Sequence, residues 1–325
     1  MKFISNDDIT AKVDIHKLTE ALRRGHSLAK ANSDRSLLVD ATATSDPKNQ
    51  LLISPAWQSG QALGVKLTAI FPGNTSKNPE LSNENGLYIL FDPQTGVPKV
   101  ALQSDALTRL KTAADSMLAA SFLARKNAEN ILIVGSGPIA YQFANAYRLM
   151  FPSLKRFFIW NRTSAKAVEM VQKLSADKAF STTQIQQVTD LQAAVEKSCI
   201  IVCATSSRQA LVKGAWVAPG THVDLVGAYT PDMRESDDEL IQRSIVCVDT
   251  RELTISGCGD LCNPIKNGVI DASHIVADLY QLCHGEHPGR QHQSQITLFK
   301  NSGGPHLDLM AAQYIAQAVQ PRISS

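Results

Sequence analysis

The stretch from Asn130 to Thr163 constrains the fold of this chain more than any other. An apolar run at residues 131–134 is long enough for a buried strand, and a second apolar run at residues 156–160 closes the stretch. Between them, the sequence GSGPIA is followed by a helical pattern. A glycine-rich turn between a strand and a helix, within a unit of about 30 residues, is typical of a dinucleotide-binding βαβ element. We therefore predict a nucleotide site at this turn.

Each small residue of the turn has its own expected task. Gly135 allows the tight turn out of the strand, and Gly137 lets the backbone approach a pyrophosphate. Ala140 stands where a third small residue lets the helix pack closely on the strand. The helix N-terminus, which includes Pro138 and Ile139, offers unpaired N–H groups and a positive dipole end to the phosphates. We expect these residues to bind the cofactor.

The residues after the second strand indicate which nicotinamide cofactor binds. An NAD site usually has Asp or Glu there, which hydrogen-bonds the ribose 2′-hydroxyl. This chain has Asn161, Arg162 and Thr163 instead. A guanidinium binds a 2′-phosphate through charge-assisted hydrogen bonds, whereas a carboxylate repels it. These residues favour NADP(H), with NAD(H) as the second choice; the plainer alternative is that Arg162 is a solvated cation after an edge strand.

Composition excludes several other classes of protein. The chain has 325 residues, 44% of them hydrophobic and 19% charged, with a formal net charge of +2. Neither disorder nor a nucleic-acid-binding surface is expected from these values, and no apolar run approaches the length of a membrane span. Without a signal peptide, the six cysteines are expected to be reduced in a cytoplasmic protein. The spacing of Cys258 and Cys262 fits no zinc pattern, so no metal is expected.

The order of the predicted elements indicates two domains. Asp14 is placed to cap a helix, and strands are predicted at residues 37–42, 50–54, 62–71, 86–91 and 97–102, forming a mostly antiparallel sheet. A helix at residues 105–126 leads into alternating strands and helices, the pattern of a doubly wound, mainly parallel sheet. An amphipathic helix at residues 307–319 is expected to return to the first domain. The predicted fold is therefore α/β, with a Rossmann-type domain at residues 119–303 inserted into a smaller α+β domain, residues 1–118 plus 304–325.

Two lysines of the first domain are candidates for chemistry. In the strand at residues 62–71, Lys66 shares a face with Gly64 and Thr68, and it enters an interdomain cleft if that face meets the nucleotide domain. The alternative is a lysine that faces water on a half-exposed sheet. Lys111 lies in the predicted helix at residues 105–126, where a surface pair with Asp115 at i,i+4 is the simpler interpretation.

Short motifs spread over nearly the whole chain resemble those of the ornithine cyclodeaminase/μ-crystallin family. In chain order they are Ser54-Pro55-Ala56-Trp57, Gly64-Val65-Lys66, Lys111-Thr112-Ala113-Ala114, Gly135-Ser136-Gly137-Pro138, Trp160-Asn161-Arg162-Thr163, Ala204-Thr205-Ser206-Ser207, Val226-Gly227-Ala228, Arg234-Glu235-Ser236-Asp237 and Leu298-Phe299-Lys300. The resemblance implies a split first domain that binds substrate and forms a homodimer, with an inserted Rossmann domain. It also implies a small-molecule substrate, with no nucleic acid or membrane as partner.

The resemblance assigns roles to the two lysines. Lys66 takes the position of the family's active-site lysine, and Lys111 takes a position usually held by an arginine that binds the substrate carboxylate. Arg35 is a second candidate for that carboxylate. The resemblance also implies that Thr112 contacts the cofactor phosphates and that Thr205, Ser206 and Val226 line the nicotinamide end. It implies that Val226 and Gly227 bind the substrate.

One departure from the family pattern separates its activities. Ornithine cyclodeaminases have an aspartate at the position of Tyr229, so cyclodeamination is disfavoured here. The resemblance then implies an NAD(P)H-dependent reductase of a cyclic imino acid, with Δ1-pyrroline-2-carboxylate as the leading substrate and Δ1-piperideine-2-carboxylate second. The alternatives are an ornithine cyclodeaminase, an enzyme like alanine dehydrogenase, and a non-catalytic NADPH-dependent binding protein of the μ-crystallin type.

Overall fold

The computed structural model describes residues 1–42, 48–78 and 80–319, and it divides into two compact units. The first unit comprises Met1–Lys111 and Gly303–Ser325, and the second comprises Thr112–Ser302. Residues 320–325, the end of the segment expected to return to the first domain, lie outside the described residues. Within the described ranges, no helix has the length and apolar character needed to cross a membrane.

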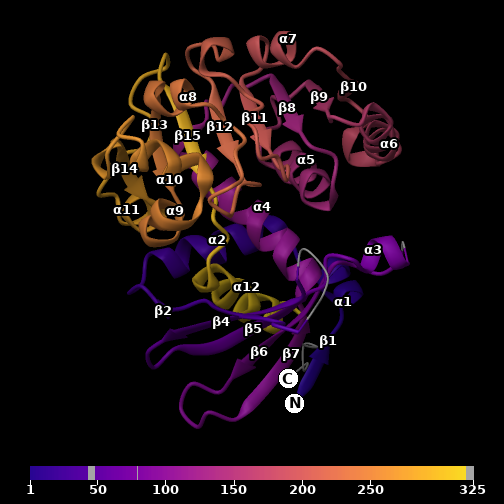
Figure 1. The fold of residues 1–325 in the computed structure, drawn as a ribbon, viewed down its shortest axis with the longest axis vertical. Helices are drawn as coiled ribbons and strands as arrows, with labels where there is room; N and C mark the ends of the chain where they lie inside the picture. Colours follow the sequence, from indigo (N-terminus) through magenta and orange to yellow (C-terminus); the bar gives the residue numbers. More distant parts are fainter. Residues whose placement is uncertain (43–47, 79, 320–325) are drawn as a thin grey trace. The chain divides into compact units, whose positions relative to one another are not determined.

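The first unit is built on a mixed sheet with the strand order β1-β7-β6-β5-β4-β2, in which β3 also pairs with β4 (Figure 1). Its strands are β1 (Lys2–Ile4), β2 (Asn32–Ser33), β3 (Ser36–Val39), β4 (Gln50–Gln58), β5 (Ala62–Ile70), β6 (Glu84–Phe91) and β7 (Pro98–Gln103). Neighbouring strands are antiparallel, except that β1 runs parallel to β7. The predicted antiparallel sheet is confirmed.

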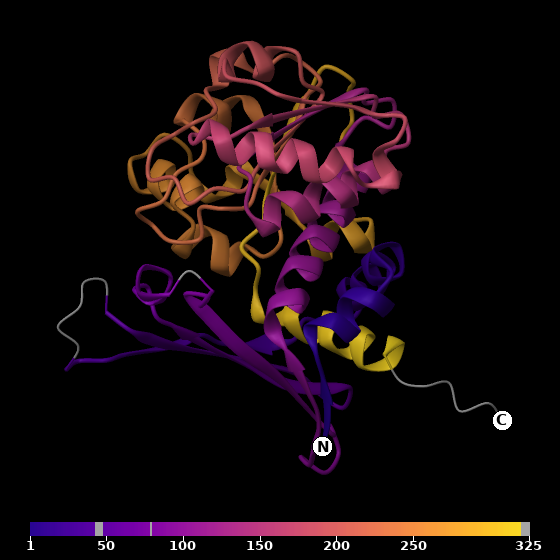
Figure 2. The same ribbon diagram turned by 90° about the vertical axis from the view of Figure 1, so that its right-hand side faces the viewer.

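Helices cover one face of this sheet. The helices of the unit are α1 (Asn6–Lys12), α2 (Ile15–His26), α3 (Asn74–Lys77), the first part of α4 (Ser104–Leu123) and α12 (Pro305–Ala318). Helix α2 begins where predicted, because the Asp14 carboxylate accepts hydrogen bonds from two backbone N–H groups of its first turn. Helix α12 packs on β4, β5 and β6 and also contacts α2, so it lies between the sheet and α2 (Figure 2).

The alternation of side chains along β5 places the face that carries Gly64, Lys66 and Thr68 under α12. The Lys66 ammonium contacts a residue of α12, which puts Lys66 and Gly64 on the covered face. Val65 and Leu67 therefore point to the opposite face, where they remain half-exposed. The sequence could not say which face would be covered. The alternative of a water-facing Lys66 is wrong, because α12 covers that face.

The second unit contains a parallel sheet with the order β10-β9-β8-β11-β12-β15-β13-β14. Its strands are β8 (Asn130–Val134), β9 (Arg156–Trp160), β10 (Gln184–Gln187), β11 (Ile200–Cys203), β12 (His222–Leu225), β13 (Ser244–Val248), β14 (Ile275–Asp278) and β15 (Ile296–Lys300). The accompanying helices are the rest of α4, α5 (Pro138–Met150), α6 (Ser164–Ser175), α7 (Leu191–Glu196), α8 (Asp238–Arg243), α9 (Arg251–Gly257), α10 (Gly259–Lys266) and α11 (Leu279–His284), with short 3-10 turns at Lys178–Phe180, Gly214–Trp216 and Ala272–His274. The chain proceeds outward from β8 in both directions, so the predicted doubly wound sheet is confirmed.

Several boundaries differ from the prediction for identifiable reasons. The strand predicted at residues 50–54 continues to Gln58, because Pro55 fits the antiparallel ladder opposite Val65. The helix predicted at residues 105–126 ends at Leu123, where Arg290 hydrogen-bonds the last carbonyl groups. Strands β1, β2, β10, β14 and β15 were not predicted, since they are short and their pairing depends on neighbours distant in sequence.

Candidate active site and cofactor site

The segments predicted to bind a nucleotide meet at one edge of the parallel sheet. The glycine turn follows β8, and residues 161–163 follow β9. Residues 205–206 follow β11, and residues 226–227 follow β12. These strands are neighbours in the order β9-β8-β11-β12 and run parallel, so their carboxyl ends share an edge. The strand order reverses between β8 and β11, the position at which open α/β sheets bind ligands.

The turn after β8 has the backbone geometry of a phosphate cradle. Gly135 has a φ of 119°, and a Cβ there would lie 2.4 Å from the carbonyl oxygen of Ala204. Gly137 is the N-cap of α5, and a Cβ on it would meet no atom within 4 Å. Pro138 opens the helix, and Ala140 is fully buried against the sheet. The open space over Gly137 and the helix N-terminus beyond it fit a dinucleotide pyrophosphate.

The segment after β9 presents a cation beside this turn. The Asn161 side chain donates a hydrogen bond of 3.0 Å to the carbonyl oxygen of Thr163, which fixes the local loop. Arg162, between them, is exposed, and Thr163 is the N-cap of α6. Because the loop is fixed while the guanidinium extends from it, Arg162 is available to an anionic group.

A buried carboxylate, which the sequence interpretation gave no role, ties two of the loops together. Glu235 accepts hydrogen bonds from the N–H of Thr205 at 2.7 Å and from its hydroxyl at 2.9 Å. Its second oxygen accepts from the N–H of Gly227 at 2.6 Å. Val226, next to Gly227, bonds through its own N–H to the carbonyl oxygen of Cys203. Glu235 therefore fixes the spacing of the loops that follow β11 and β12.

A second buried pair supports Glu235 from behind. Asp260 accepts from the N–H groups of Glu235 at 2.8 Å and Ser236 at 3.0 Å, and its other oxygen lies 3.4 Å from the Lys300 ammonium. Burial raises the pKa of Glu235, and the charge of Lys300 opposes that rise. The sequence signal was the motif around Glu235, but nothing in it indicated contacts with residues 30 positions earlier.

Thr112, a predicted cofactor contact, is held in place by its backbone. Its carbonyl oxygen accepts a hydrogen bond of 3.1 Å from the Asn301 side chain, which donates also to the Ser116 hydroxyl. Ser116 in turn donates to the buried carboxyl of Asp224 in β12 at 2.9 Å. Within the second unit, α4 is thus bonded to the sheet close to Thr112. Ser206, by contrast, is exposed after β11.

In the first unit, two lysines share one buried carboxylate. The Lys66 ammonium lies 2.7 Å from one oxygen of Asp308, and the Lys111 ammonium lies 2.7 Å from the other. The side chains of Lys111 and Asp308 are each 1% exposed, whereas that of Lys66 is 13% exposed. Of the two lysines, Lys66 is therefore the one that a small molecule can reach.

Lys111 is surrounded by acceptors. Besides Asp308, its ammonium donates to the carbonyl oxygens of Gly303 at 2.7 Å and Gly304 at 3.4 Å. These contacts replace the surface pair at i,i+4 that was the simpler interpretation of this lysine. Arg35 also reaches the group, since it donates to the Gly303 carbonyl oxygen at 3.2 Å. Burial lowers the pKa of Lys111 to about 8, and the Asp308 charge offsets part of that effect.

Asp308 was not identified from the sequence. It lies in the first turn of α12, which was predicted only as an amphipathic helix. The available signal was one carboxylate in an otherwise uncharged helical segment, PHLDLMAAQYIAQA. Burial alone would raise its pKa, but Lys111 and Lys66 together hold the pKa of Asp308 below its ordinary value. Three cations and one anion leave the group with an excess of positive charge, which suits a substrate carboxylate.

Known proteins resemble this chain over almost its full length. The model of the ornithine cyclodeaminase/mu-crystallin family matches residues 7–322. A Delta(1)-pyrroline-2-carboxylate reductase of Paracoccus denitrificans is 39% identical over 318 residues, which cover 98% of this chain and 97% of that protein. The structure of the Thermococcus litoralis Delta(1)-pyrroline-2-carboxylate reductase in complex with NADH and L-proline is 29% identical, with a TM-score of 0.89 over 98% of this chain and 97% of that one. An archaeal alanine dehydrogenase dimer with bound NAD has the same fold, at 24% identity and a TM-score of 0.87 over 98% and 95% of the two chains.

Proposed function

Because this chain belongs to the ornithine cyclodeaminase/mu-crystallin family, we propose that it reduces a cyclic imino acid with a nicotinamide cofactor. The leading substrate is Δ1-pyrroline-2-carboxylate, which gives L-proline, and the six-membered homologue is second. The observation that carries the proposal is the likeness to pyrroline-2-carboxylate reductases along the full length of both chains. The partly exposed Lys66 beside a buried carboxylate supplies the acid that the reaction needs.

The residues of the first unit have separable tasks in this proposal. The Lys66 ammonium hydrogen-bonds the imine nitrogen and donates the proton that this nitrogen gains on reduction. Asp308 keeps that ammonium oriented, because it accepts from Lys66 at 2.7 Å. Arg35 and the positive charge of Lys111 hold the substrate carboxylate. Since three acceptors already surround the Lys111 ammonium, direct contact with the carboxylate requires it to release a carbonyl group of residues 303–304.

The residues at the sheet edge of the second unit would hold the cofactor. When bound, a reduced nicotinamide supplies the hydride for the imine carbon. Gly135, Gly137 and the first N–H groups of α5 would bind the pyrophosphate. The loops fixed by Glu235, with Thr205 in one and Gly227 in the other, would line the nicotinamide end, together with Ser206 and Val226.

We propose NADPH as the preferred cofactor, on the basis of the exposed Arg162 and of the absence of a carboxylate from residues 161–163. Replacing Arg162 with Ala should raise the KM for NADPH by about ten- to a hundredfold, because a charge-assisted hydrogen bond to the 2′-phosphate is lost. The KM for NADH should stay near its original value. Steady-state kinetics with both cofactors measure the ratio of the KM for NADPH to the KM for NADH. If Arg162→Ala leaves this ratio unchanged, Arg162 is a solvated surface residue.

A substrate panel separates the proposed activity from its rivals within the family. Cyclic imines of both ring sizes, and pyruvate with ammonia, are each assayed by loss of reduced-nicotinamide absorbance. The reductase predicts turnover with a cyclic imine, whereas an enzyme like alanine dehydrogenase predicts turnover with pyruvate and ammonia. A non-catalytic binding protein predicts cofactor binding with no turnover. Tyr229, where cyclodeaminases have aspartate, predicts no release of ammonia from ornithine.

The same assay tests the role of Lys66. Replacing Lys66 with Ala should lower kcat by about 10²- to 10⁴-fold, the range expected when a general acid is removed. Cofactor affinity, measured by fluorescence titration, should change little. Lys99→Ala, at an exposed lysine of β7 in the same unit, is the matched control and should retain full activity. Near-normal turnover of Lys66→Ala would remove Lys66 from the mechanism.

We also propose that the chain forms a homodimer through the open face of the first sheet. This face, opposite α12, carries half-exposed or exposed apolar side chains from three neighbouring strands: Ile53, Trp57, Leu63, Val65, Leu67, Leu87 and Ile89. A continuous apolar face of this kind is typical of a protein interface. The archaeal alanine dehydrogenase of the same fold is a dimer.

A further inference from the structure

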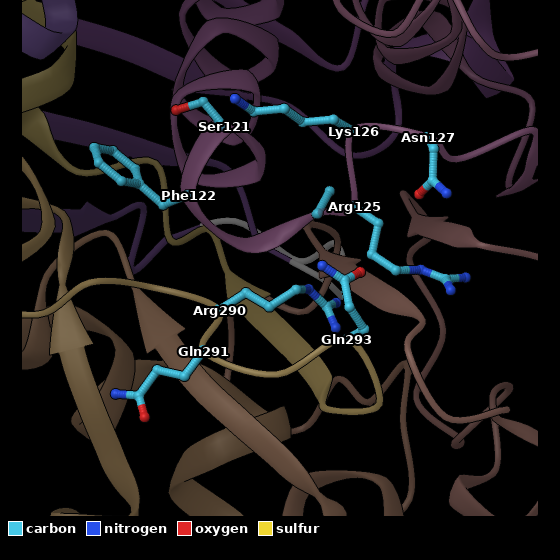
Figure 3. Close-up of a pocket in the computed structure, with 9 residues that line it drawn as sticks. Ser121, Phe122, Arg125, Lys126, Asn127, Arg290, Gln291 and Gln293 are labelled. Carbon is cyan, nitrogen blue, oxygen red and sulfur yellow. The ribbon is translucent and has the colours of Figure 1, made fainter.

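A hollow of about 670 Å³ in the second unit has a strongly one-sided charge. It lies beside the C-terminal end of α4 and the segment that precedes β15 (Figure 3). Among the described residues that line it there are three cations and no carboxylate. Its charged and amide side chains are Arg125, Lys126, Arg290, Asn127, Gln291 and Gln293.

Arg290 has a structural task but keeps its charge. Its guanidinium donates to the carbonyl oxygen of Leu123 at 2.6 Å, to that of Gln295 at 2.5 Å, and to the hydroxyl of Thr297 at 2.8 Å. All of these acceptors are neutral, so within the described ranges no ion pair cancels the positive charge of Arg290. Burial first and the charge of Arg125 second lower the pKa of Arg290 to about 10, which leaves it protonated at neutral pH.

Arg125 and Lys126 have no such structural task. Within the described part of the chain, neither side chain makes a hydrogen bond or an ion pair, and the Nε of Arg125 is buried without a partner. The Arg125 guanidinium lies against the backbone of Gly220, where a Cβ would come within 3.0 Å of its Cζ. In the view of Figure 3, Gln293 lies between the guanidinium groups of Arg125 and Arg290. The charge of Arg125 acts on Arg290, and no carboxylate stands among the described residues that line the hollow with them.

The simpler interpretation is that these cations stabilise the negative end of the α4 dipole. That accounts for Arg290, which bonds to the carbonyl groups of Phe122 and Leu123 through its backbone and side chain. It does not account for Arg125 and Lys126, which lie beyond the last residue of the helix, and Arg125 adds repulsion to Arg290. An anion in the hollow would relieve that repulsion.

We propose that this hollow binds a phosphate-bearing small molecule. A guanidinium pairs with phosphate through two parallel hydrogen bonds, and a lysine and carboxamide N–H groups supply further donors. A phosphate dianion matches several cations better than a single carboxylate does. The volume lies within the range of about 300–1,000 Å³ typical of small-molecule sites. This site is distinct from the turn after β8, and its existence does not depend on the reductase activity.

Calorimetric titration of the full chain tests the proposal. The probes are inorganic phosphate, glucose 6-phosphate as a phosphate ester and succinate as a dicarboxylate, each in the presence of saturating NADPH so that the cofactor site is filled. The expected result is that phosphate or its ester binds with a Kd of up to about 10 mM, and that succinate binds with a higher Kd. Tighter binding of the ester than of free phosphate would identify an organic phosphate as the ligand. No binding of either phosphate, or equal binding of succinate, would overturn the proposal.

Variants locate the binding in this hollow. Arg125→Gln and Lys126→Gln should each weaken phosphate binding by at least about tenfold, because one charged donor is lost. Lys178→Gln removes an exposed lysine elsewhere in the second unit and should leave the binding unchanged. Arg290 is left intact because it caps α4. Unchanged binding in Arg125→Gln with an unchanged melting temperature would contradict the assignment.

Discussion

At the scale of single residues, Asp308 is the carboxylate that keeps positive charge on the neighbouring ammonium groups of the candidate active site. Two ammonium groups in a buried site repel each other and lose hydration, which favours loss of a proton. The shared carboxylate opposes this, since each of its oxygens lies 2.7 Å from one lysine. Lys111 still has its pKa lowered to about 8. The charge available to a substrate carboxylate is therefore sensitive to pH just above neutrality.

A pH profile of the KM for the imino acid tests this arrangement. As the pH rises through about 8, Lys111 loses its proton and one positive charge disappears, so the KM should rise. Replacing Asp308 with Asn removes the negative charge that keeps the Lys111 ammonium protonated. The alkaline limb of the profile, where the KM rises, should therefore move to lower pH by about 1–3 units. Asp105→Asn, at an exposed carboxylate of α4, should leave the profile unchanged. The same alkaline limb in wild type and Asp308→Asn would contradict the proposed role of Asp308.

Some residues of the candidate active site could be identified from the sequence, and others only from the structure. Lys66 was singled out by strand alternation and by resemblance, and its chemical role remains a prediction. The grouping of Lys66, Lys111 and Asp308 was not predictable from local sequence, because the three residues come from a strand and two helices far apart in the chain. The resemblance made Arg35 a candidate for the substrate carboxylate, and its hydrogen bond to the Gly303 carbonyl oxygen places it beside Lys111.

At the scale of elements, the loops after β11 and β12 are fixed by one close contact as well as by Glu235. A Cβ on Gly227 would lie 1.8 Å from the carbonyl oxygen of Thr205 and 2.6 Å from the Glu235 carboxylate. These loops therefore approach each other more closely than any residue with a side chain allows. The strands themselves were predictable as short apolar runs, whereas this loop contact was not.

Replacing Gly227 with Ala should separate the two loops. Overpacking of this kind costs about 1–3 kcal/mol, so the melting temperature should fall by several degrees, and cofactor affinity should fall by about tenfold or more. Gly257→Ala is the matched control, because a Cβ there would meet nothing within 4 Å, and its stability should stay within about 0.5 kcal/mol of wild type. Thermal unfolding and fluorescence titration measure both effects. Normal cofactor affinity in Gly227→Ala would show that cofactor binding does not depend on the spacing of these two loops.

At the scale of the whole molecule, the open face of the first sheet has no covering element in the described chain. Its apolar residues alternate in β4, β5 and β6 with the residues that face α12. If a second copy of the chain packed against it through the same face, the open faces of both copies would be buried, as in a two-fold symmetric dimer. Such a dimer would explain why the apolar residues of β5 point away from α12 while its lysine points toward that helix.

A charge placed on that face should prevent association. Leu87, in β6, is 38% exposed, and Leu87→Lys should convert the dimer to a monomer, because an uncompensated ammonium would be buried in the interface. Light scattering after size-exclusion chromatography measures the mass. Leu149→Lys, at a 47% exposed leucine of α5, should remain dimeric. A monomeric wild-type chain would contradict the proposed interface.

The sequence by itself determined the features that depend on neighbouring residues. These are the βαβ element, the glycine turn with its conformational requirement at Gly135, and the alternating strands and helices of the second unit. Tertiary structure decided which face of β5 is covered, that a carboxylate from α12 joins two lysines, and that Glu235 links two loops. Periodicity assigns residues to faces but does not say what covers each face. Contacts between distant segments depend on the complete fold, which no local pattern encodes.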